Sequence, residues 1–114
     1  MKRAVRCSVV VPVYNEQEVL PVFHRELSEV LRSLGEPFEI IYVDDGSEDR
    51  SLEILRSLAA AEPEVRGVRL SRNFGHQLAL SAGLELAEGQ AVVTLAMSQA
   101  TCSIQRFRPR DDRF

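Results

Sequence analysis

The chain has 114 residues, of which 45% are hydrophobic and 27% are charged, and its formal net charge is -3. This length accommodates one compact domain, and an acidic balance argues against a nucleic-acid partner, which usually requires a basic face. No apolar run approaches the ~20 residues that cross a bilayer, and the basic start lacks the cleavage site of a signal peptide. We therefore expect a cytoplasmic chain with no transmembrane segment.

The cysteine content gives no sign of a metal site or a disulfide framework. The two cysteines, Cys7 and Cys102, are far apart and match no metal-binding spacing. A reducing compartment is the simplest setting for such a chain. We expect no disulfide between them.

The first predicted elements are a strand and a helix. Residues 6–13 (RCSVVVPV) are rich in β-branched side chains, which indicates a buried strand. From residue 16 to residue 34, apolar side chains recur every three or four positions. This period predicts an amphipathic helix that ends before Gly35.

A second strand and helix follow in the same order. Residues 38–43 (FEIIYV) predict a buried strand that stops at the DDG sequence of residues 44–46. Either Ser47 or Asp49 is expected to cap the next helix, since both residue types are good N-caps. Pro63 is expected to end that helix.

The remaining segments complete the alternation. Residues 65–70 predict a third strand, residues 76–87 a third helix, and residues 91–95 a fourth strand. Helices between strands require crossover connections, which join parallel strands. The predicted fold class is therefore α/β, with a mainly parallel sheet covered by helices on both faces.

The pattern breaks after the fourth strand. Residues 96–114 show neither a helical nor a strand period, and their end is crowded with arginine and aspartate. We therefore divide the chain into a domain at residues 1–95 and a tail at residues 96–114 that is expected to be unstructured. Without a later strand, the apolar strand at 91–95 would leave an open sheet edge that invites aggregation.

Polar segments follow the first three predicted strands. They are residues 12–16 (PVYNE), 44–47 (DDGS) and 71–77 (SRNFGHQ). In an open parallel sheet, ligands bind at the carboxyl ends of the strands. We therefore expect these three segments to converge on one edge of the sheet and to form a binding site there.

Several nucleotide-binding and catalytic motifs are absent from the sequence. No G-x-G-x-x-G follows the first strand, and neither a P-loop nor a G-x-S-x-G nucleophile motif occurs. A site built from carboxylates and a tyrosine would hold a nucleotide by its base and ribose. The diphosphate would then be left to a metal ion.

The polar segments together resemble family 2 glycosyltransferases. Residues 10–16 (VVPVYNE), 43–47 (VDDGS) and 73–77 (NFGHQ) occur in the family's order, and each alone is a weak signal. They look most like the dolichyl- or undecaprenyl-phosphate sugar transferases. The resemblance covers about residues 6–95, roughly the first half of such a catalytic domain, and implies a GT-A fold.

This resemblance implies a role for each matching residue. The residues expected to bind the nucleotide are Pro12, Tyr14, Glu16, Asp44, Asp45 and Ser47. Arg72 and Asn73 would lie on the sugar-diphosphate side. The implied partners are a UDP- or GDP-sugar and a polyprenyl-phosphate acceptor, which would place the intact enzyme at the cytoplasmic face of the membrane.

The sequence departs from the family where the metal ligands are expected. In the family, a D-x-D motif after the fourth strand holds Mg²⁺ or Mn²⁺ against the diphosphate, but here Ala96 and Ser98 occupy those positions. Neither side chain is a useful ligand for a hard cation. Loss of one carboxylate–cation interaction in the transition state costs roughly three powers of ten in rate. We therefore predict no retained catalytic residue, no well-bound metal and no useful turnover.

A reading-frame change is one hypothesis for this departure. Residues 100–105 (ATCSIQ) can be encoded so that a shifted frame reads Asp-Leu-Gln-His-Pro, which resembles the continuation of the family sequence. The gene sequence beyond this point would test the hypothesis.

Two other functional classes stay open. The chain could be a non-catalytic nucleotide-binding remnant, or a receiver-like or other flavodoxin-like regulatory domain. A receiver carries its acidic pair after the first strand and a phospho-acceptor aspartate after the third. This chain has residues 14–16 (YNE) and 71–72 (SR) at those places.

Purely structural roles also compete with the predicted site. Asp44 and Asp45 could simply cap the following helix. Tyr14 and Phe74 could be core aromatics, and His76 could serve only to begin a helix.

Overall fold

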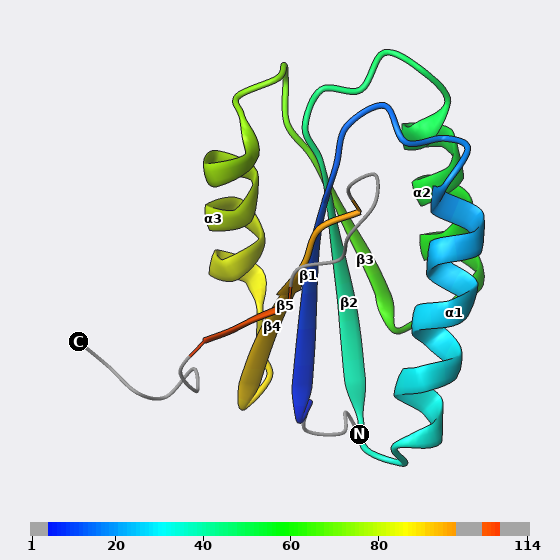
Figure 1. Cartoon of the computed structure of the whole chain (residues 1–114), viewed down its shortest axis with the longest axis vertical. Coiled ribbons are helices and arrows are strands. Elements are labelled where there is room, and N and C mark those ends of the chain that lie inside the picture. Colours follow the sequence, from blue (N-terminus) through cyan, green and yellow to red (C-terminus); the bar gives the residue numbers. More distant parts are fainter. Residues whose placement is uncertain (1–4, 98–103, 108–114) are drawn as a thin grey trace.

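The computed structural model describes residues 5–97 and 104–107 of the chain. Helices flank a five-stranded sheet with the strand order β3-β2-β1-β4-β5, as Figure 1 shows. The elements are β1 (Cys7–Val13), α1 (Leu20–Ser33), β2 (Phe38–Asp44), α2 (Ser51–Ala61), β3 (Val65–Arg69), α3 (His76–Leu86), β4 (Ala91–Leu95) and β5 (Ile104–Phe107).

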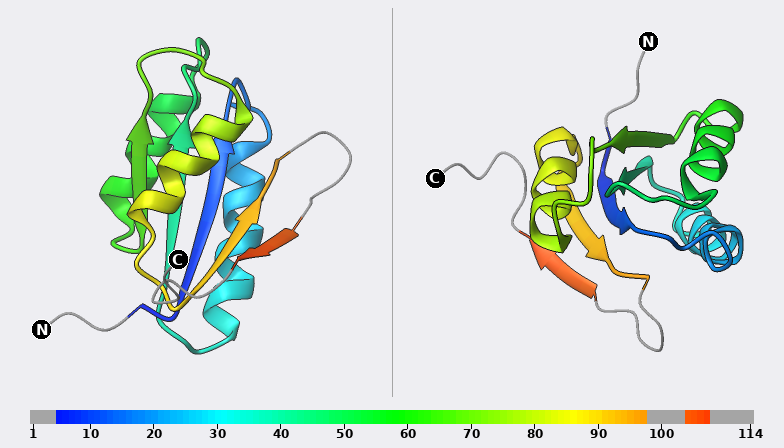
Figure 2. Two further views of the ribbon diagram at one scale, coloured as in Figure 1. Left: turned by 90° about the vertical axis from the view of Figure 1, so that its left-hand side faces the viewer. Right: turned by 90° about the horizontal axis from the view of Figure 1, so that it is seen from above.

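The sheet is parallel except at one edge. Strand β1 pairs in parallel with β2 on one side and with β4 on the other, and β3 extends the sheet beyond β2. Helices α1 and α2 cover one face of the sheet, and α3 covers the other (Figure 2). The predicted α/β class with a mainly parallel sheet is confirmed, and strand order reverses between β1 and β4, where such folds bind ligands.

Alternating side chains of β1 supply the two halves of the core. Val9, Val11 and Val13 pack in the cluster beneath α1 and α2, whereas Val10 packs in the cluster beneath α3. This period of two is the normal consequence of the strand pleat. Gly83 lets α3 lie close to the sheet, because a Cβ there would overlap the side chain of Val10.

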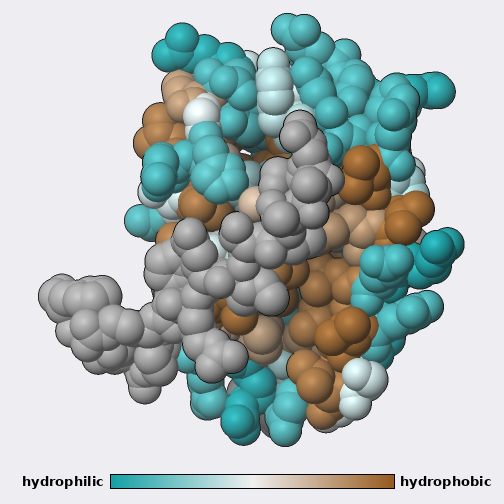
Figure 3. Space-filling view, viewed as in Figure 1, coloured by the Kyte–Doolittle hydropathy of each residue, from teal (hydrophilic) through white to brown (hydrophobic). Residues whose placement is uncertain are grey.

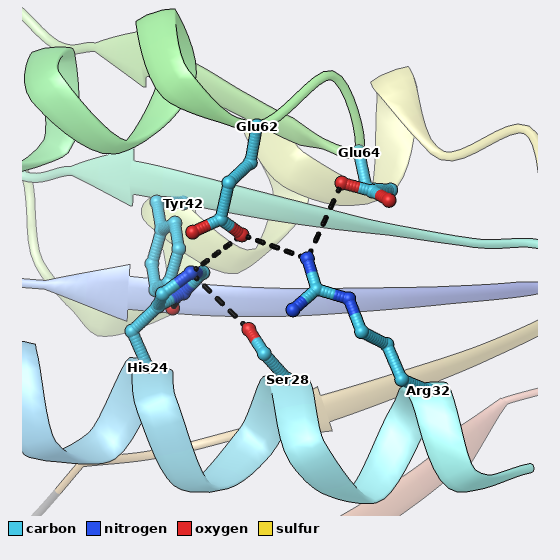
Figure 4. A network of polar contacts seen from close by, with 6 residues as sticks. All are labelled: His24, Ser28, Arg32, Tyr42, Glu62 and Glu64. Carbon is cyan, nitrogen blue, oxygen red and sulfur yellow. Dashed lines mark hydrogen bonds and ion pairs between the residues drawn. The ribbon is translucent and has the colours of Figure 1, made fainter.

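A partly buried polar network connects α1 to β2 and to the end of α2, and Figure 4 shows its six residues. His24 contacts the Tyr42 hydroxyl through Nδ1 at 2.7 Å and the Glu62 carboxylate through Nε2 at 3.0 Å. Burial, together with the charge of Glu62, raises the pKa of Tyr42 far above its usual value. The hydroxyl therefore stays protonated and can donate to Nδ1, while Nε2–H donates to Glu62.

Helix α1 begins at Leu20, four positions later than predicted. The backbone N–H of Glu16 donates to the Ser51 hydroxyl at 2.9 Å, and that of Gln17 donates to the Asp49 carboxylate at 3.2 Å. These contacts hold the segment against the beginning of α2. The predicted helical start was wrong. Residues 16 and 17 are held outside the helix by partners more than thirty positions away, which a local pattern cannot reveal.

The predicted caps of α2 were also wrong. The N-cap residue is Arg50, without a side-chain hydrogen bond, and the helix begins at Ser51. The Ser47 hydroxyl instead accepts the backbone N–H of Asn15 at 2.9 Å. The Asp49 carboxylate accepts the N–H of Ser51 at 2.9 Å, a local turn that precedes the helix.

The prediction of an unstructured tail from residue 96 onward was wrong at two places. Met97 is 5% exposed and belongs to the core cluster beneath α1 and α2. Strand β5 pairs antiparallel with β4, so the edge that was expected to be open is hydrogen-bonded. A four-residue strand is too short to show a period in the sequence. Cys102 lies outside the described residues, so the predicted lack of a disulfide stays a prediction.

No helix in the described part of the chain combines the length and the apolar character needed to cross a membrane.

Candidate functional site

A cleft of about 320 Å³ lies at the carboxyl ends of β1, β2 and β4. This volume is at the small end of the range for ligand pockets. Five predicted site residues line the cleft: Pro12, Tyr14, Glu16, Asp45 and Asn73. They come from three segments that are far apart in the sequence, so the expected convergence of these segments is confirmed.

The first wall of the cleft is the segment that follows β1. Tyr14 is 44% exposed there, so it is not a core aromatic residue. Asn15 adopts a positive φ of 53°, a backbone conformation that asparagine tolerates better than most residues. Its side-chain oxygen accepts the N–H of Glu48 at 2.8 Å. With the Ser47 contact, this bond ties the wall to the segment after β2.

Glu16 is the acidic residue of the first wall. Partial burial and repulsion from the nearby Asp49 carboxylate raise the pKa of Glu16 above its ordinary value. Its position in the cleft is set by its backbone, which is held at the beginning of α2. The side chain thus offers the cleft a carboxylate whose charge the surrounding protein does not favour.

Asp45 is the buried carboxylate of the cleft, at 4% exposure. Its oxygens accept the backbone N–H of Phe74 at 2.8 Å and of Gly75 at 3.0 Å. The Asn73 side-chain amide also donates to it at 3.2 Å. The backbone N–H of Asp45 donates to the Val13 carbonyl at 2.8 Å. Asp45 therefore joins both walls.

Asp44 lies in the protein interior and does not line the cleft. Its Oδ2 accepts the N–H of Ser47 at 3.2 Å, and its Oδ1 is buried without a hydrogen-bond partner among the described residues. Ser47, whose hydroxyl bonds Asn15, is also absent from the lining. Neither Asp44 nor Asp45 caps α2 with its side chain.

The second wall of the cleft is the segment of residues 73–76, just before and at the beginning of α3, of which Asn73, Gly75 and His76 line the cleft. Phe74 is 39% exposed, so it too is not a core aromatic. The Arg72 guanidinium lies 4.6 Å from its ring centroid, a cation–π contact outside the cleft lining. His76, the first residue of α3, does line the cleft. His76 belongs to the polar segment 71–77 that was expected at the site, and it also begins α3.

The residues present do not fit the divalent cation that the family resemblance implied. Ala96, which the resemblance aligned with the first family aspartate, lines the cleft with a methyl group, and Ser98 lies outside the described residues. Within residues 5–97 and 104–107, no group of three or more metal-ligating side chains comes together. The acidic residues in the described lining are Glu16 and Asp45. The oxygens of Asp45 already accept protein N–H groups, so the two carboxylates do not form a joint cation site.

Comparison with known proteins decides the family. The model of glycosyl transferase family 2 matches residues 8–96, most of the chain. The chain belongs to glycosyl transferase family 2. The match begins in β1 and ends at the first residue after β4, so it includes every described residue of the cleft except Met97.

Three curated relatives of this family 2 chain are bacterial or phage glycosyltransferases. It is 50% identical over 90 residues to undecaprenyl-phosphate 4-deoxy-4-formamido-L-arabinose transferase of Pectobacterium carotovorum, covering 77% of this chain and 27% of that protein. It is 45% identical over 95 residues to an uncharacterized glycosyltransferase of Bacillus subtilis, YkcC, covering 83% and 29%. It is 40% identical over 90 residues to the bactoprenol glucosyl transferase of Shigella phage SfV, covering 79% and 29%. The chain thus spans less than a third of each relative.

Solved structures give the same result. The mannosyltransferase PcManGT of Pyrobaculum calidifontis, in complex with GDP-Man and Mn²⁺, is similar with a TM-score of 0.65 and 28% identity, over 80% of this chain and 27% of that one. TarS of S. aureus in complex with UDP-GlcNAc is similar with a TM-score of 0.60 and 29% identity, over 81% and 26%. The GT-A fold expected from the sequence is confirmed.

Proposed function

We propose that the cleft binds the nucleotide part of a UDP- or GDP-sugar. In the intact enzyme, this half of the domain presents the sugar for transfer to a polyprenyl phosphate at the cytoplasmic face of the membrane. The observation that carries the proposal is the convergence of Tyr14, Asp45 and Asn73 on one cleft at the carboxyl edge of the sheet. Family 2 enzymes bind a donor nucleotide. The volume of this cleft lies within the range of ligand pockets, and polar groups line it.

The cleft residues suit a nucleoside. An ionised carboxylate has about four acceptor sites, and three N–H donors contact Asp45, so it can accept one more from the edge of uracil or guanine. Such charge-assisted bonds are about twice as strong as neutral ones. The exposed ring of Tyr14 offers a face for stacking, and Glu16 can accept ribose hydroxyls. By the family resemblance, Arg72 and Asn73 would lie on the sugar-diphosphate side.

The related proteins support the two substrate classes. PcManGT was solved with GDP-Man and TarS with UDP-GlcNAc, so both bases occur among the structural relatives. Two of the curated relatives are named for undecaprenyl phosphate or bactoprenol. By analogy, the acceptor is a polyprenyl phosphate, whose anionic oxygen needs little help from a general base.

We further propose that the 114-residue chain binds its donor nucleotide weakly and does not turn it over. The methyl group of Ala96 lines the cleft, and the family resemblance implies a metal-binding carboxylate at this position. A carboxylate–cation pair at about 4 Å contributes ~4 kcal/mol at an effective dielectric constant of 20. Removing it from the transition state lowers the rate by roughly a thousandfold.

A calorimetric titration tests the donor site and the claim that the chain has lost its metal-dependent binding. UDP, UDP-glucose and GDP-mannose are each titrated into the chain with and without Mn²⁺. We expect weak binding of one nucleotide class that Mn²⁺ leaves unchanged. Tyr14→Ala should weaken this binding, whereas Leu34→Ala, at an exposed apolar residue on the far end of α1, should not. Absence of binding by every nucleotide would refute the donor site, and Mn²⁺-dependent binding would refute the claim about the metal.

A further inference from the structure

The Asp45 carboxylate makes more hydrogen bonds to the protein than a residue that only contacts a ligand would need. Its three N–H donors all belong to residues 73–75, nearly thirty positions away in the sequence. Among the described residues, no cationic side chain pairs with it. Its charge is therefore balanced by N–H groups of the second wall, and that wall is in turn held by the charge.

These bonds fix the beginning of α3. Gly75 is the N-cap residue of α3, with a φ of +105°, and the helix has no side-chain cap of its own. Because the carboxylate of Asp45 accepts the N–H of Gly75, it lies at the helix terminus where a negative charge is favoured. His76, the next residue, lines the cleft. From just after β2, the side chain of Asp45 thus accepts one N–H at a helix terminus that has no side-chain cap of its own.

The neighbouring glycine allows this close approach. Gly46 has a φ of +75°, and a Cβ there would overlap backbone atoms of Arg72 and Asn73. The backbone before the second wall therefore rests directly on the turn that carries Asp45. No side chain separates the two segments.

The opposite end of β2 carries a matched carboxylate. Glu39 accepts the backbone N–H of Glu88 at 2.7 Å, just after α3, and pairs with Arg66 at 3.0 Å. Strand β2 thus holds the chain on both sides of α3, once at the cleft and once away from it. Glu39 provides a control for the loss of a buried carboxylate that leaves the cleft intact.

We propose that Asp45 is a positioning residue for the second wall of the cleft, in addition to the base contact proposed above. Its carboxylate sets the backbone of residues 73–75 and the first turn of α3, so that Asn73 and His76 face the ligand. The positioning role concerns the ligand-free protein. Only its consequence for affinity rests on the proposed function.

Amide hydrogen exchange in the ligand-free, full 114-residue chain tests the proposal. In Asp45→Asn, exchange at the amides of Phe74 and Gly75 should accelerate about tenfold or more, since each loses a bond to a charged acceptor. In Glu39→Gln, the amide of Glu88 should accelerate and those of Phe74 and Gly75 should keep their wild-type rates. Unchanged exchange at Phe74 and Gly75 in a folded Asp45→Asn chain would overturn the proposal.

A measurement on the unaltered protein covers the case in which Asp45→Asn does not fold. A scalar coupling across the hydrogen bond should link the amide nitrogen of Phe74 to the carboxyl carbon of Asp45. Its absence, with rapid exchange of the Phe74 amide, would overturn the positioning role. The nucleotide titration judges the donor site separately, so failure of either claim can be recognised without the other.

Discussion

The two ends of β2 hold the same element by similar means and differ in what surrounds them. Asp45 and Glu39 are both buried carboxylates that accept backbone N–H groups beside α3. Glu39 is also bonded by the Ser8 hydroxyl and by the Arg66 guanidinium, so protein groups alone satisfy it. Asp45 has no such cation among the described residues and borders the cleft.

This difference separates a structural carboxylate from the one that we propose binds the nucleotide. Burial and hydrogen bonding are common to both residues, so neither property identifies the site. Each carboxylate accepts three hydrogen bonds, so what separates them is the Arg66 guanidinium beside Glu39 and the cleft beside Asp45. The Glu39 end should therefore control stability alone, and the Asp45 end should control both stability and ligand affinity.

The largest expected effect comes from the Glu39 end of β2. Glu39→Ala should lower the free energy of unfolding by about 3–5 kcal/mol, because it leaves the Ser8 hydroxyl and the Glu88 N–H without an acceptor and removes the partner of the half-exposed Arg66. Urea unfolding measures this loss. Conditions that keep the variant folded should show wild-type nucleotide affinity. A loss below about 1 kcal/mol would show that the hydrogen bonds of Glu39 add little to the stability of the fold.

Two glycines test the packing at the Asp45 end of β2, because Gly46 lies there and Gly35 does not. Gly46 and Gly35 share a φ of +75°, but only at Gly46 does a Cβ meet other atoms. Gly46→Ala should lower the free energy of unfolding by about 2–4 kcal/mol, from backbone strain plus displacement of the second wall. Gly35→Ala should cost about 1–2 kcal/mol, from strain alone.

Thermal or urea unfolding of the two glycine variants gives the difference, and nucleotide titration gives its consequence. Gly46→Ala should weaken nucleotide binding, whereas Gly35→Ala should leave it unchanged. Equal effects of the two substitutions on both measurements would mean that the contact between Gly46 and the second wall is unimportant.

The two tyrosines separate the polar network from the cleft. Tyr42→Phe removes the hydroxyl that contacts His24 and should lower stability by about 1 kcal/mol without changing nucleotide affinity. Tyr14→Phe removes an exposed hydroxyl and should leave stability unchanged. Denaturant midpoints of the two variants test the contrast. A Tyr42→Phe chain as stable as Tyr14→Phe would show that the network adds nothing.

Local patterns in the sequence were sufficient for most of the fold. The first four strands and the three helices each contain enough residues to show a period, and their alternation implies a parallel sheet. Convergence of the three polar segments follows from that topology. Strand β5 has four residues and no visible period, and the true beginning of α1 depends on the distant Ser51 and Asp49. Neither could be read from neighbouring residues.

The site was predicted at the level of segments more successfully than at the level of side chains. Asp44 and Asp45 are adjacent, and successive residues of an extended chain point to opposite sides. Only the assembled sheet decides which of them reaches the cleft. Ser47 was selected for the family motif it belongs to, yet its hydroxyl holds the backbone of Asn15. The roles proposed for Asp45 and Tyr14 in nucleotide binding remain predictions.

The smallest expected effect concerns Glu16, where the cleft carries a charge that the fold does not favour. Because the pKa of Glu16 is raised, the folded chain holds this proton more tightly than the unfolded chain does. Stability is therefore lost as pH rises through the raised pKa, and the loss is complete at neutral pH. Below about pH 4, the ordinary range of a glutamate, both states are protonated and the loss disappears. Glu16→Gln should thus be slightly more stable than wild type at pH 7.

The exposed Glu18 provides the matched control for this charge removal. The stability difference between Glu16→Gln and Glu18→Gln, measured from unfolding midpoints, should favour Glu16→Gln at pH 7 and shrink toward zero as the pH falls to about 4. No difference at pH 7 would mean that repulsion from Asp49 is screened by solvent. If Glu16→Gln gains stability and also loses nucleotide affinity, the charge is kept for binding at the expense of the fold, as residues at functional sites often are. That combination would mark the Asp45 edge as the working end of β2, since removing the Glu39 charge should produce the opposite result.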